Sequence, residues 1–349
     1  MIARPGSSVI DARFYELIGP VAAAEIAAAT GAVVVRGDGG APVAALAPLD
    51  RAGTGDLAFC EAVPRSGRIE TAATACLVPP GAGAVLPEGT VALEVRAPKS
   101  TLGAAVARLV RLRTLAPDQP ALHPDAVLED GVQVLPGAVI GAGARIGRGT
   151  VIGASATIGP GVCIGRDCQI GHGVRIVCAL IGDRVRIGSN SVIGEAGFGV
   201  TGLPENPVDV PQLGRVVIQD DVTLGALVAV DRAAFGETVV GLASKIDNFV
   251  HVGHNVRLGR GVVIAAFGGI SGSTEVGDFV LMGGRVGIGD HHVIGERAIL
   301  AAGSAVLSDV PAREIWQGYP AQPAMRWRRE QVMLRRLAEP KKPDPQKKS

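Results

Sequence analysis

The chain has 349 residues, of which 47% are hydrophobic, so it is long enough to bury a sizeable core in two or three units. Its 34 Lys and Arg against 33 Asp and Glu give a formal charge of +1, which excludes a surface devoted as a whole to nucleic acid or membranes. Aromatic residues make up only 3% whereas there are 49 glycines, so the core must consist of aliphatic side chains between closely spaced turns.

The cysteines and the apolar segments bear on the cellular compartment. The five cysteines include no Cys-x-x-Cys pair, which favours free thiols in a reducing environment over a disulfide framework. The apolar stretch from Pro20 to Val35 is interrupted by Glu25, and the first residues lack the pattern of a signal peptide. No uncharged run is long enough for a spanning helix. We therefore expect a cytoplasmic protein without a membrane span.

Residues 1–115 show no regular period. A helix-like stretch precedes a strand-like run from Ala32 to Arg36, and a second helix is expected near Ser100 to Leu112. This mixture predicts a separate N-terminal α/β domain. A proline-bearing linker over residues 116–125 then leads into the next domain.

Residues 126–312 carry an aliphatic residue at every sixth position. One block runs from Val134 to Ile176, a single deletion shifts the register before Ile181, and the last block runs from Val240 to Val306. Glycine commonly follows the aliphatic residue, so each unit is a short strand and a turn. Three units close a triangular coil, and stacked coils bury a continuous core. The pattern predicts a mainly β protein, a left-handed parallel β-helix of hexapeptide repeats.

The repeat is interrupted between Ile193 and Ile218. The interruption contains the run Gly194–Gly199 and a loop that ends in Pro211–Arg215. It could be surface decoration, but a loop that leaves a rigid stack is also where binding residues tend to be placed. We favour the functional interpretation.

The last segment, residues 313–349, begins among prolines and is basic. A helix is predicted from Ala324 to Leu337, and a Lys- and Pro-rich tail follows it. Two interpretations of the helix stay open: a solvated cap, or a docking surface for an acidic partner such as a carrier protein.

The repeat register also places the histidines. With Val252 as a core residue, His254 falls in the turn and His251 points outward. His291 also points outward, whereas His292 takes a slot that usually holds a small inward residue. The run Ile246–Asn255 thus gathers an acid, amides and two imidazoles on one coil edge, which indicates a functional site.

Together with the motifs Asp231-Arg232 and Pro211–Arg215, the run Ile246–Asn255 resembles the UDP-3-O-acylglucosamine N-acyltransferase family. The resemblance extends to Gly55–Phe59 and to Gly318–Ala321, and so covers nearly the whole chain. It implies a homotrimer with active sites between neighbouring β-helices. It also implies transfer of a 3-hydroxyacyl chain from acyl carrier protein to the 2-amine of UDP-3-O-acylglucosamine, in lipid A biosynthesis. No cofactor or metal is implied beyond the 4'-phosphopantetheine arm of the carrier.

The resemblance also implies roles for single residues. His254 matches the general base that takes the proton of the attacking amine, and Gly272 matches the backbone N–H donor to the oxyanion. Asp247 and Asn248 match polar residues beside the base; the expected role of Asp247 is to orient the ring, and holding the pantetheine arm stays open as the alternative. Phe59 matches the residue that stacks on uracil in the N-terminal uridine-binding domain. Phe198 lies in the loop that matches the sugar and phosphate site. Substrate-binding roles are also implied for Asn248, His251 and His291.

The chain departs from the family pattern at a few positions. Ala62 and Arg65 stand where Asn and Tyr are expected around the uracil, which puts uridine recognition in question. Asp209 stands where Lys is common. Ser304 and Ala305 stand near the acyl pocket where bulkier residues can occur, so a longer acyl chain is expected.

Three other functions are compatible with a β-helix of this kind. A metal-dependent β-helix enzyme, resembling the gamma-class carbonic anhydrases, needs three converging imidazoles, and the spacing of His251, His254 and His291 does not match that family. A non-catalytic scaffold paralogue has the same fold but has no need of a base beside a backbone donor. The nearest enzymatic alternative is a sugar acyltransferase that uses acyl-CoA or acetyl-CoA and a different acceptor.

Overall fold

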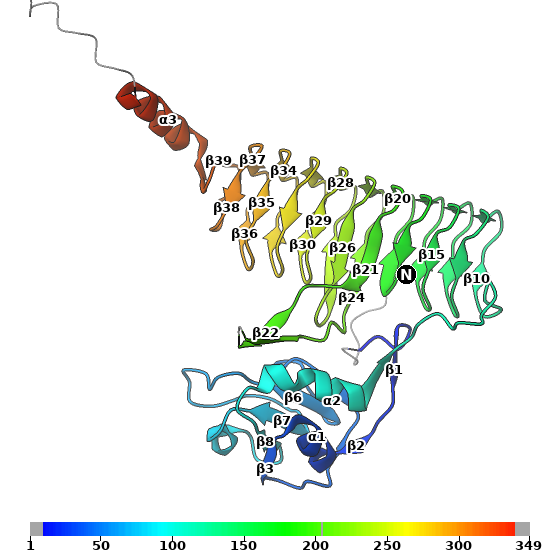
Figure 1. Cartoon of the computed structure of the whole chain (residues 1–349), viewed down its shortest axis with the longest axis vertical. Coiled ribbons are helices and arrows are strands. Elements are labelled where there is room, and N and C mark those ends of the chain that lie inside the picture. The colour runs from blue at the N-terminus through cyan, green and yellow to red at the C-terminus, as the bar shows by residue number, and fades with distance from the viewer. Residues whose placement is uncertain (1–9, 204, 339–349) are drawn as a thin grey trace, which may run out of the picture.

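The computed structural model describes residues 10–203 and 205–338. Three sheets wind around a common axis, and each complete coil contributes one strand to each sheet (Figure 1). Neighbouring strands in these sheets are parallel except for the last pair of one sheet, which is antiparallel. Coil sheet 1 consists of β10 (Val127–Leu128), β13 (Arg145–Ile146), β16 (Cys163–Ile164), β19 (Ala179–Ile181), β24 (Arg215–Ile218), β27 (Glu237–Val240), β30 (Arg257–Leu258), β33 (Glu275–Val276) and β36 (Val293–Ile294).

The other two sheets complete the parallel β-helix. Coil sheet 2 consists of β11 (Gln133–Val134), β14 (Val151–Ile152), β17 (Gln169–Ile170), β20 (Arg186–Ile187), β25 (Thr223–Leu224), β28 (Lys245–Ile246), β31 (Val263–Ile264), β34 (Leu281–Met282), β37 (Ile299–Leu300), β39 (Ile315–Gly318) and β40 (Ala321–Pro323). Coil sheet 3 consists of β12 (Val139–Ile140), β15 (Thr157–Ile158), β18 (Arg175–Ile176), β21 (Val192–Ala196), β26 (Ala229–Arg232), β29 (His251–Val252), β32 (Gly269–Ile270), β35 (Gly287–Ile288) and β38 (Ala305–Val306). The predicted hexapeptide β-helix is confirmed, while its left-handed sense stays a prediction.

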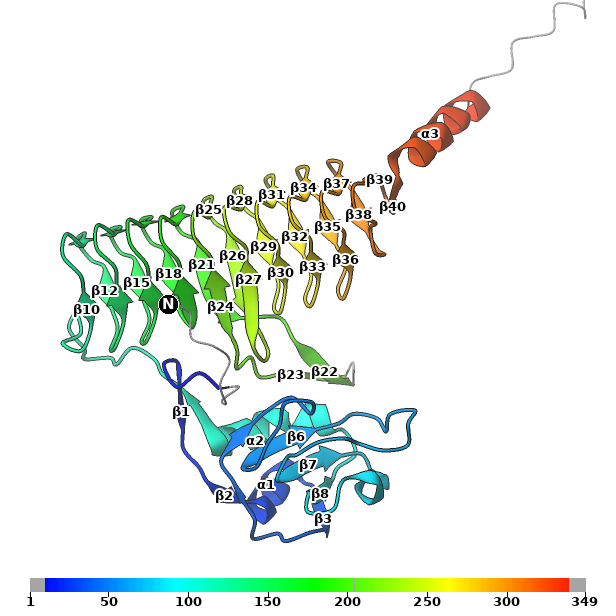
Figure 2. The same ribbon diagram turned by 180° about the vertical axis from the view of Figure 1, so that it is seen from behind.

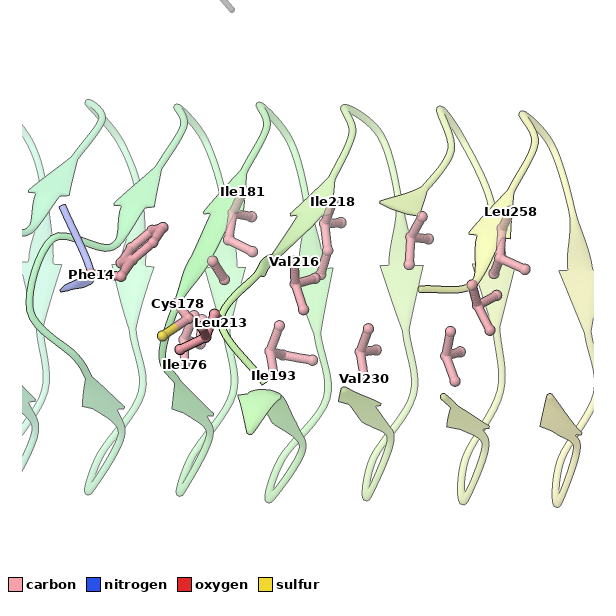
Figure 3. Packing of buried hydrophobic residues seen from close by; sticks show 14 of the residues in the cluster. Phe14, Ile176, Cys178, Ile181, Ile193, Leu213, Val216, Ile218, Val230 and Leu258 are labelled. Atoms are coloured by element: carbon pink, nitrogen blue, oxygen red, sulfur yellow. The ribbon is translucent and has the colours of Figure 1, made fainter. Parts of the chain in front are cut away.

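The aliphatic residues of the six-residue period form the core. Ile152, Ile193 and Val230 are fully or almost fully buried, and Figure 3 shows such side chains pointing into the space that the coils enclose. Val134 is the exception at 40% exposed, because it lies in the first coil of its sheet, where no earlier coil covers it. Burial of one aliphatic side chain stabilises the fold by roughly 1.5–3 kcal/mol, so the column as a whole holds the stack together.

The N-terminal part is a small α/β unit. A five-stranded sheet has the order β3-β8-β7-β6-β5, and α1 and α2 contact each other beside it. The elements are β1 (Tyr15–Leu17), β2 (Val21–Ala22), α1 (Ala23–Thr30), β3 (Val33–Arg36), β4 (Pro42–Val43), β5 (Ala45–Leu46), β6 (Asp56–Phe59), β7 (Ala75–Val78), β8 (Val91–Glu94), α2 (Leu102–Leu109) and β9 (Val110–Leu112), with 3-10 turns at Ala82–Val85 and Pro98–Thr101. The two predicted helices and the strand near Ala32 to Arg36 are therefore present.

The interruption of the repeat is a long loop that leaves the stack after β21. It contains the antiparallel hairpin of β22 (Val200–Leu203) and β23 (Asn206–Asp209). Figures 1 and 2 agree that this hairpin projects from the coils toward the α/β unit.

At the far end, helix α3 (Ala324–Ala338) extends away from the last coils. Among the described residues, no helix is both long and apolar enough to cross a membrane.

Candidate active site

His254 lies in the turn that leads from coil sheet 3 to coil sheet 1, directly after β29. Its ring is enclosed by two glycines. A Cβ atom on Gly272 would lie 2.6 Å from the ring atoms Cε1 and Nε2, and one on Gly197 would lie 2.7 Å from the Cβ of His254. Both distances are well below ordinary contact, so a Cβ atom at either place would displace the His254 side chain. Steric contact with the two glycines therefore helps to position this half-buried imidazole.

The tautomer of His254 follows from its neighbour Asn255. The Asn255 Oδ1 atom accepts from the backbone N–H of Ala234 at 2.9 Å, and Nδ2 donates to the carbonyl of Phe235 at 2.9 Å. These two bonds fix the amide, so Oδ1 can only accept, and the partner at 3.2 Å, His254 Nδ1, must carry the hydrogen. The other ring nitrogen, Nε2, then holds a lone pair, which is the form a general base requires.

Gly272 stands one coil further along, beside Nε2. Its carbonyl accepts from the backbone N–H of His291 at 3.1 Å, whereas its own N–H bonds to no acceptor within the described part of the chain. A free backbone donor next to an imidazole is an arrangement that can stabilise a developing oxyanion. The structure thus brings together two of the residues that the sequence singled out.

Asp247 and Asn248 lie at a different corner, between coil sheets 2 and 3. The Asp247 carboxylate accepts from the backbone N–H of Asn248 at 2.7 Å, and Asn248 Oδ1 accepts from Ala226 at 2.7 Å. The residue that holds the imidazole within one chain is Asn255, not Asp247. An orienting role for Asp247 would need a second copy of the chain, and it stays a prediction.

His251 lies on the outer face of β29, exposed as the register predicted. Its Nε2 atom is 2.9 Å from Asp231 Oδ2. The hydrogen bond to this carboxylate raises the pKa of His251 against the opposing effect of partial burial. Protonated His251 is therefore stabilised, which suits it to a binding role better than to proton abstraction.

His291 takes the turn position two coils beyond His254, in the left-handed conformation with φ of 59°. Successive coils are about 4.8 Å apart, so the two imidazoles are separated by roughly 10 Å along the axis. His291 is exposed and too distant to share a proton with His254. His292, which the register placed inward, is only 24% exposed, and its Nδ1 lies 3.5 Å from Asp309.

The two predicted aromatic ligands of the nucleotide lie on separate elements. Phe59 ends β6 in the α/β unit and is half-buried, while Phe198 lies in the long loop and is 85% exposed. Arg65, at one of the departures from the family pattern, is exposed. Among the described residues, no group of three His, Cys, Asp or Glu side chains could hold a metal ion.

Comparison with known proteins supports the resemblance. The bacterial transferase hexapeptide (six repeats) family matches residues 125–160 and 143–178. The UDP-3-O-acylglucosamine N-acyltransferase of Caulobacter sp. (strain K31) is 53% identical over 330 residues, which cover 94% of this chain and 97% of the relative. The enzyme of the same name from Methylobacterium sp. (strain 4-46) is 47% identical over 339 residues, covering 94% and 96%.

The chain belongs to the UDP-3-O-acylglucosamine N-acyltransferase family. It is therefore an acyltransferase. Among solved structures, the UDP-N-acetylglucosamine acyltransferase from Campylobacter jejuni is 25% identical, covers 62% of this chain and 81% of its own, and superposes with a TM-score of 0.40.

In this member of the N-acyltransferase family, the motifs Asp231-Arg232 and Pro211–Arg215, for which the sequence indicated no contacts, meet each other and Tyr15. Arg232 is 8% exposed, and it donates to the carbonyl of Gln212 at 2.8 Å and to that of Gly194 at 3.0 Å. The hydroxyl of Tyr15 donates to the Gly214 carbonyl at 3.0 Å. Burial raises the pKa of this hydroxyl, so it stays a donor. These contacts fix the long loop against the first strand of the N-terminal unit.

Proposed function

We propose that the protein transfers a 3-hydroxyacyl chain from acyl carrier protein to the 2-amine of UDP-3-O-acylglucosamine in lipid A biosynthesis, with His254 as general base. The observation that carries the proposal is the His254 ring between Gly197 and Gly272, with Nδ1 held by Asn255. The names and the identity of the relatives support the reaction class and the acceptor.

The chemistry follows from this geometry. The amine nitrogen attacks the thioester carbonyl carbon, a C–N bond forms, and Nε2 of His254 takes the proton that the nitrogen loses. The carbonyl oxygen becomes an oxyanion, which the free N–H of Gly272 stabilises. When the intermediate collapses, the C–S bond breaks and the imidazolium returns its proton to the leaving sulfur. The products are an amide and the free thiol of the carrier.

The C-terminal helix supports an acidic donor protein. Of the five arginines in α3, Arg326 pairs with Glu330 at 3.0 Å, and it alone of them forms an ion pair within the described part of the chain. The remaining four are exposed: Arg328, Arg329, Arg335 and Arg336. Exposed cations of this kind steer an anionic partner to its binding site. The 4'-phosphopantetheine arm arrives with that partner, and no other cofactor is needed.

A homotrimer in the cytoplasm completes the proposal. Leu227, Phe249 and Phe267 form an exposed apolar column along the corner between coil sheets 2 and 3, and the two phenyl rings stack with centroids 4.9 Å apart. A contiguous exposed apolar column of this kind marks an interface. Contact there with a second copy would also give Asp247 and Asn248 a neighbouring active site to act on.

The test is a transfer assay with matched donors and acceptors. The purified protein is mixed with 3-hydroxyacyl carrier protein or the corresponding acyl-CoA, and with UDP-3-O-acylglucosamine, and the product is followed by mass spectrometry. Formation of the N-acylated product from the carrier protein supports the proposal. Transfer from acyl-CoA alone, or to another amino sugar alone, would favour the alternative acyltransferase. No transfer by a folded trimer would favour the scaffold.

A further inference from the structure

The corner between coil sheets 3 and 1 is enlarged in the coil just before the candidate base. Val230 of β26 and Val240 of β27 are successive buried core residues, yet they are ten positions apart in the chain. In the next coil the corresponding residues, Val252 and Leu258, are only six positions apart. The extra length lies between the two strands, in the loop of residues 233–236. This loop is the expanded corner of the stack.

The expanded corner changes how the turn that carries the base is held. In the two coils that follow, the third residue of the turn has a left-handed backbone, and its N–H donates to the main-chain carbonyl one coil earlier. The distances are 2.9 Å from Ser273 to His254 and 3.1 Å from His291 to Gly272. Asn255 is the third residue of the turn at the base and has the same backbone, with φ of 61°. Its N–H donates instead to the hydroxyl of Thr238, at 2.8 Å.

The carbonyl groups of the expanded corner accept from other donors. Three of them accept from the backbone N–H groups of Leu213–Arg215, the end of the long loop, at 2.8–3.0 Å. The fourth, that of Phe235, accepts from Nδ2 of Asn255 at 2.9 Å. An N–H group that is withdrawn from water without an acceptor is costly, so the turn at the base needs a substitute for the missing carbonyl. The hydroxyl of Thr238 is that substitute.

Thr238 is well placed to be a fixed acceptor. It lies on the inner side of β27, is fully buried, and pairs with Val216 of β24. A β-branched side chain has few rotamers, which limits the directions that its hydroxyl can take. From this hydroxyl, one hydrogen bond of 2.8 Å leads to the main chain of Asn255, and a second of 3.2 Å leads from Asn255 Oδ1 to His254 Nδ1. Two bonds in series therefore link Thr238 to the imidazole.

We propose that Thr238 is a positioning residue for His254, whose hydroxyl fixes the main chain of Asn255 so that Oδ1 stays against Nδ1 of the imidazole. The inference rests on the proposed function, in which His254 is the base. Without the hydroxyl, the Asn255 N–H loses its acceptor and the turn moves to find another. Oδ1 moves with the turn, so Nδ1 loses a fixed acceptor and part of the protein carries the ring hydrogen on Nε2. In that tautomer Nε2 has no lone pair to take a proton from the amine.

Two substitutions and two measurements test this role. Thr238→Val replaces the hydroxyl by a methyl group, whereas Thr238→Ser keeps the hydroxyl. Nitrogen-15 NMR of histidine-labelled protein at alkaline pH, without substrates, reports which ring nitrogen carries the hydrogen, and the His254 signal is assigned by its loss in His254→Ala. We expect the hydrogen on Nδ1 in the wild type and Thr238→Ser, and on both nitrogens in Thr238→Val. In the transfer assay we expect Thr238→Val to lower kcat about tenfold with the KM for the acceptor unchanged, and Thr238→Ser to keep the wild-type kcat.

Thr150→Val is the matched control. Thr150 is also fully buried, and its hydroxyl likewise accepts from a backbone N–H, that of Cys168 at 3.0 Å, but it lies at another corner of the stack. We expect Thr150→Val to lower the melting temperature at least as much as Thr238→Val does, while the His254 tautomer and kcat stay as in the wild type.

Three results would overturn the assignment: a wild-type tautomer and kcat in Thr238→Val, an equal loss of kcat in Thr150→Val, or a loss in Thr238→Ser as large as in Thr238→Val. If Thr238→Val does not fold, Thr238→Ser decides, because a changed tautomer or a tenfold loss of kcat with the hydroxyl retained would exclude the role. A tautomer that changes as expected in a protein that transfers no acyl group would support the positioning by Thr238 and count against the proposed reaction.

Discussion

Gly272→Ala is the most direct perturbation of the proposed geometry. The added methyl would lie 2.6 Å from Cε1 and Nε2 of His254, whereas carbon atoms in contact prefer 3.5–4.0 Å, so the ring must shift by about 1 Å. The shift is not free, because Gly197 lies against the other side of the residue and Asn255 holds Nδ1. A 1 Å misplacement of a reacting group costs on the order of 100-fold in rate, or roughly 2.7 kcal/mol.

The assay is the steady-state rate of N-acylation together with thermal unfolding. We expect kcat to fall about 100-fold while the melting temperature stays close to that of the wild type, because Gly272 lies in a turn and its φ is not positive. Gly284→Ala is the control, since its new methyl would meet only the carbonyl of Ala266 at 3.4 Å. A kcat within threefold of wild type in Gly272→Ala would refute the view that the two glycines position the base.

Three further predictions follow from single contacts. Asn255→Gly removes the amide that holds Nδ1 of His254, while glycine tolerates the φ of 61° at this position. We expect kcat to fall roughly 10- to 100-fold with KM unchanged. An unchanged kcat would show that Asn255 does not set the tautomer of His254. The hydrogen bond to Asp231 raises the pKa of His251 above 6.5. The wild type should therefore have a higher melting temperature than Asp231→Asn between about pH 5 and 6.5, and this difference in melting temperature should vanish as the pH rises through the raised pKa. A difference in melting temperature that grows with pH would contradict the stabilisation of protonated His251 by Asp231. Ala305→Met in β38 should shift donor preference toward shorter acyl chains, with a loss of about 0.8 kcal/mol of binding free energy for each methylene excluded. Transfer of only short acyl chains by the wild type would refute the expected longer acyl group.

The sequence predicted most of the coil but only part of the site. The period of six placed the aliphatic core because every coil repeats the same packing, and the same register placed His254 in a turn and His251 on the surface. Asn255 carried a usable signal that was missed: it follows His254 at a turn position with a left-handed backbone, which Asn tolerates well.

The remaining contacts could not be read from any local pattern. The Tyr15 hydroxyl meets the Gln212 carbonyl across 197 positions of the chain, and only the folded loop brings Gly197 against His254. Contacts of this kind depend on how the interruption of the repeat folds back, and the repeat itself does not encode that. The orienting role expected for Asp247 came from the family resemblance, which cannot distinguish contacts within one chain from contacts between copies.

His254 is proposed to take the proton of the attacking amine. Single-turnover transfer from 3-hydroxyacyl carrier protein to UDP-3-O-acylglucosamine would be compared for the wild type and His254→Ala, with acceptor affinity measured separately for each. We expect His254→Ala to lose about 10²–10⁴ in the transfer rate at nearly unchanged acceptor affinity. A transfer rate within tenfold of the wild type would contradict it, and the base would then have to be sought elsewhere in the site.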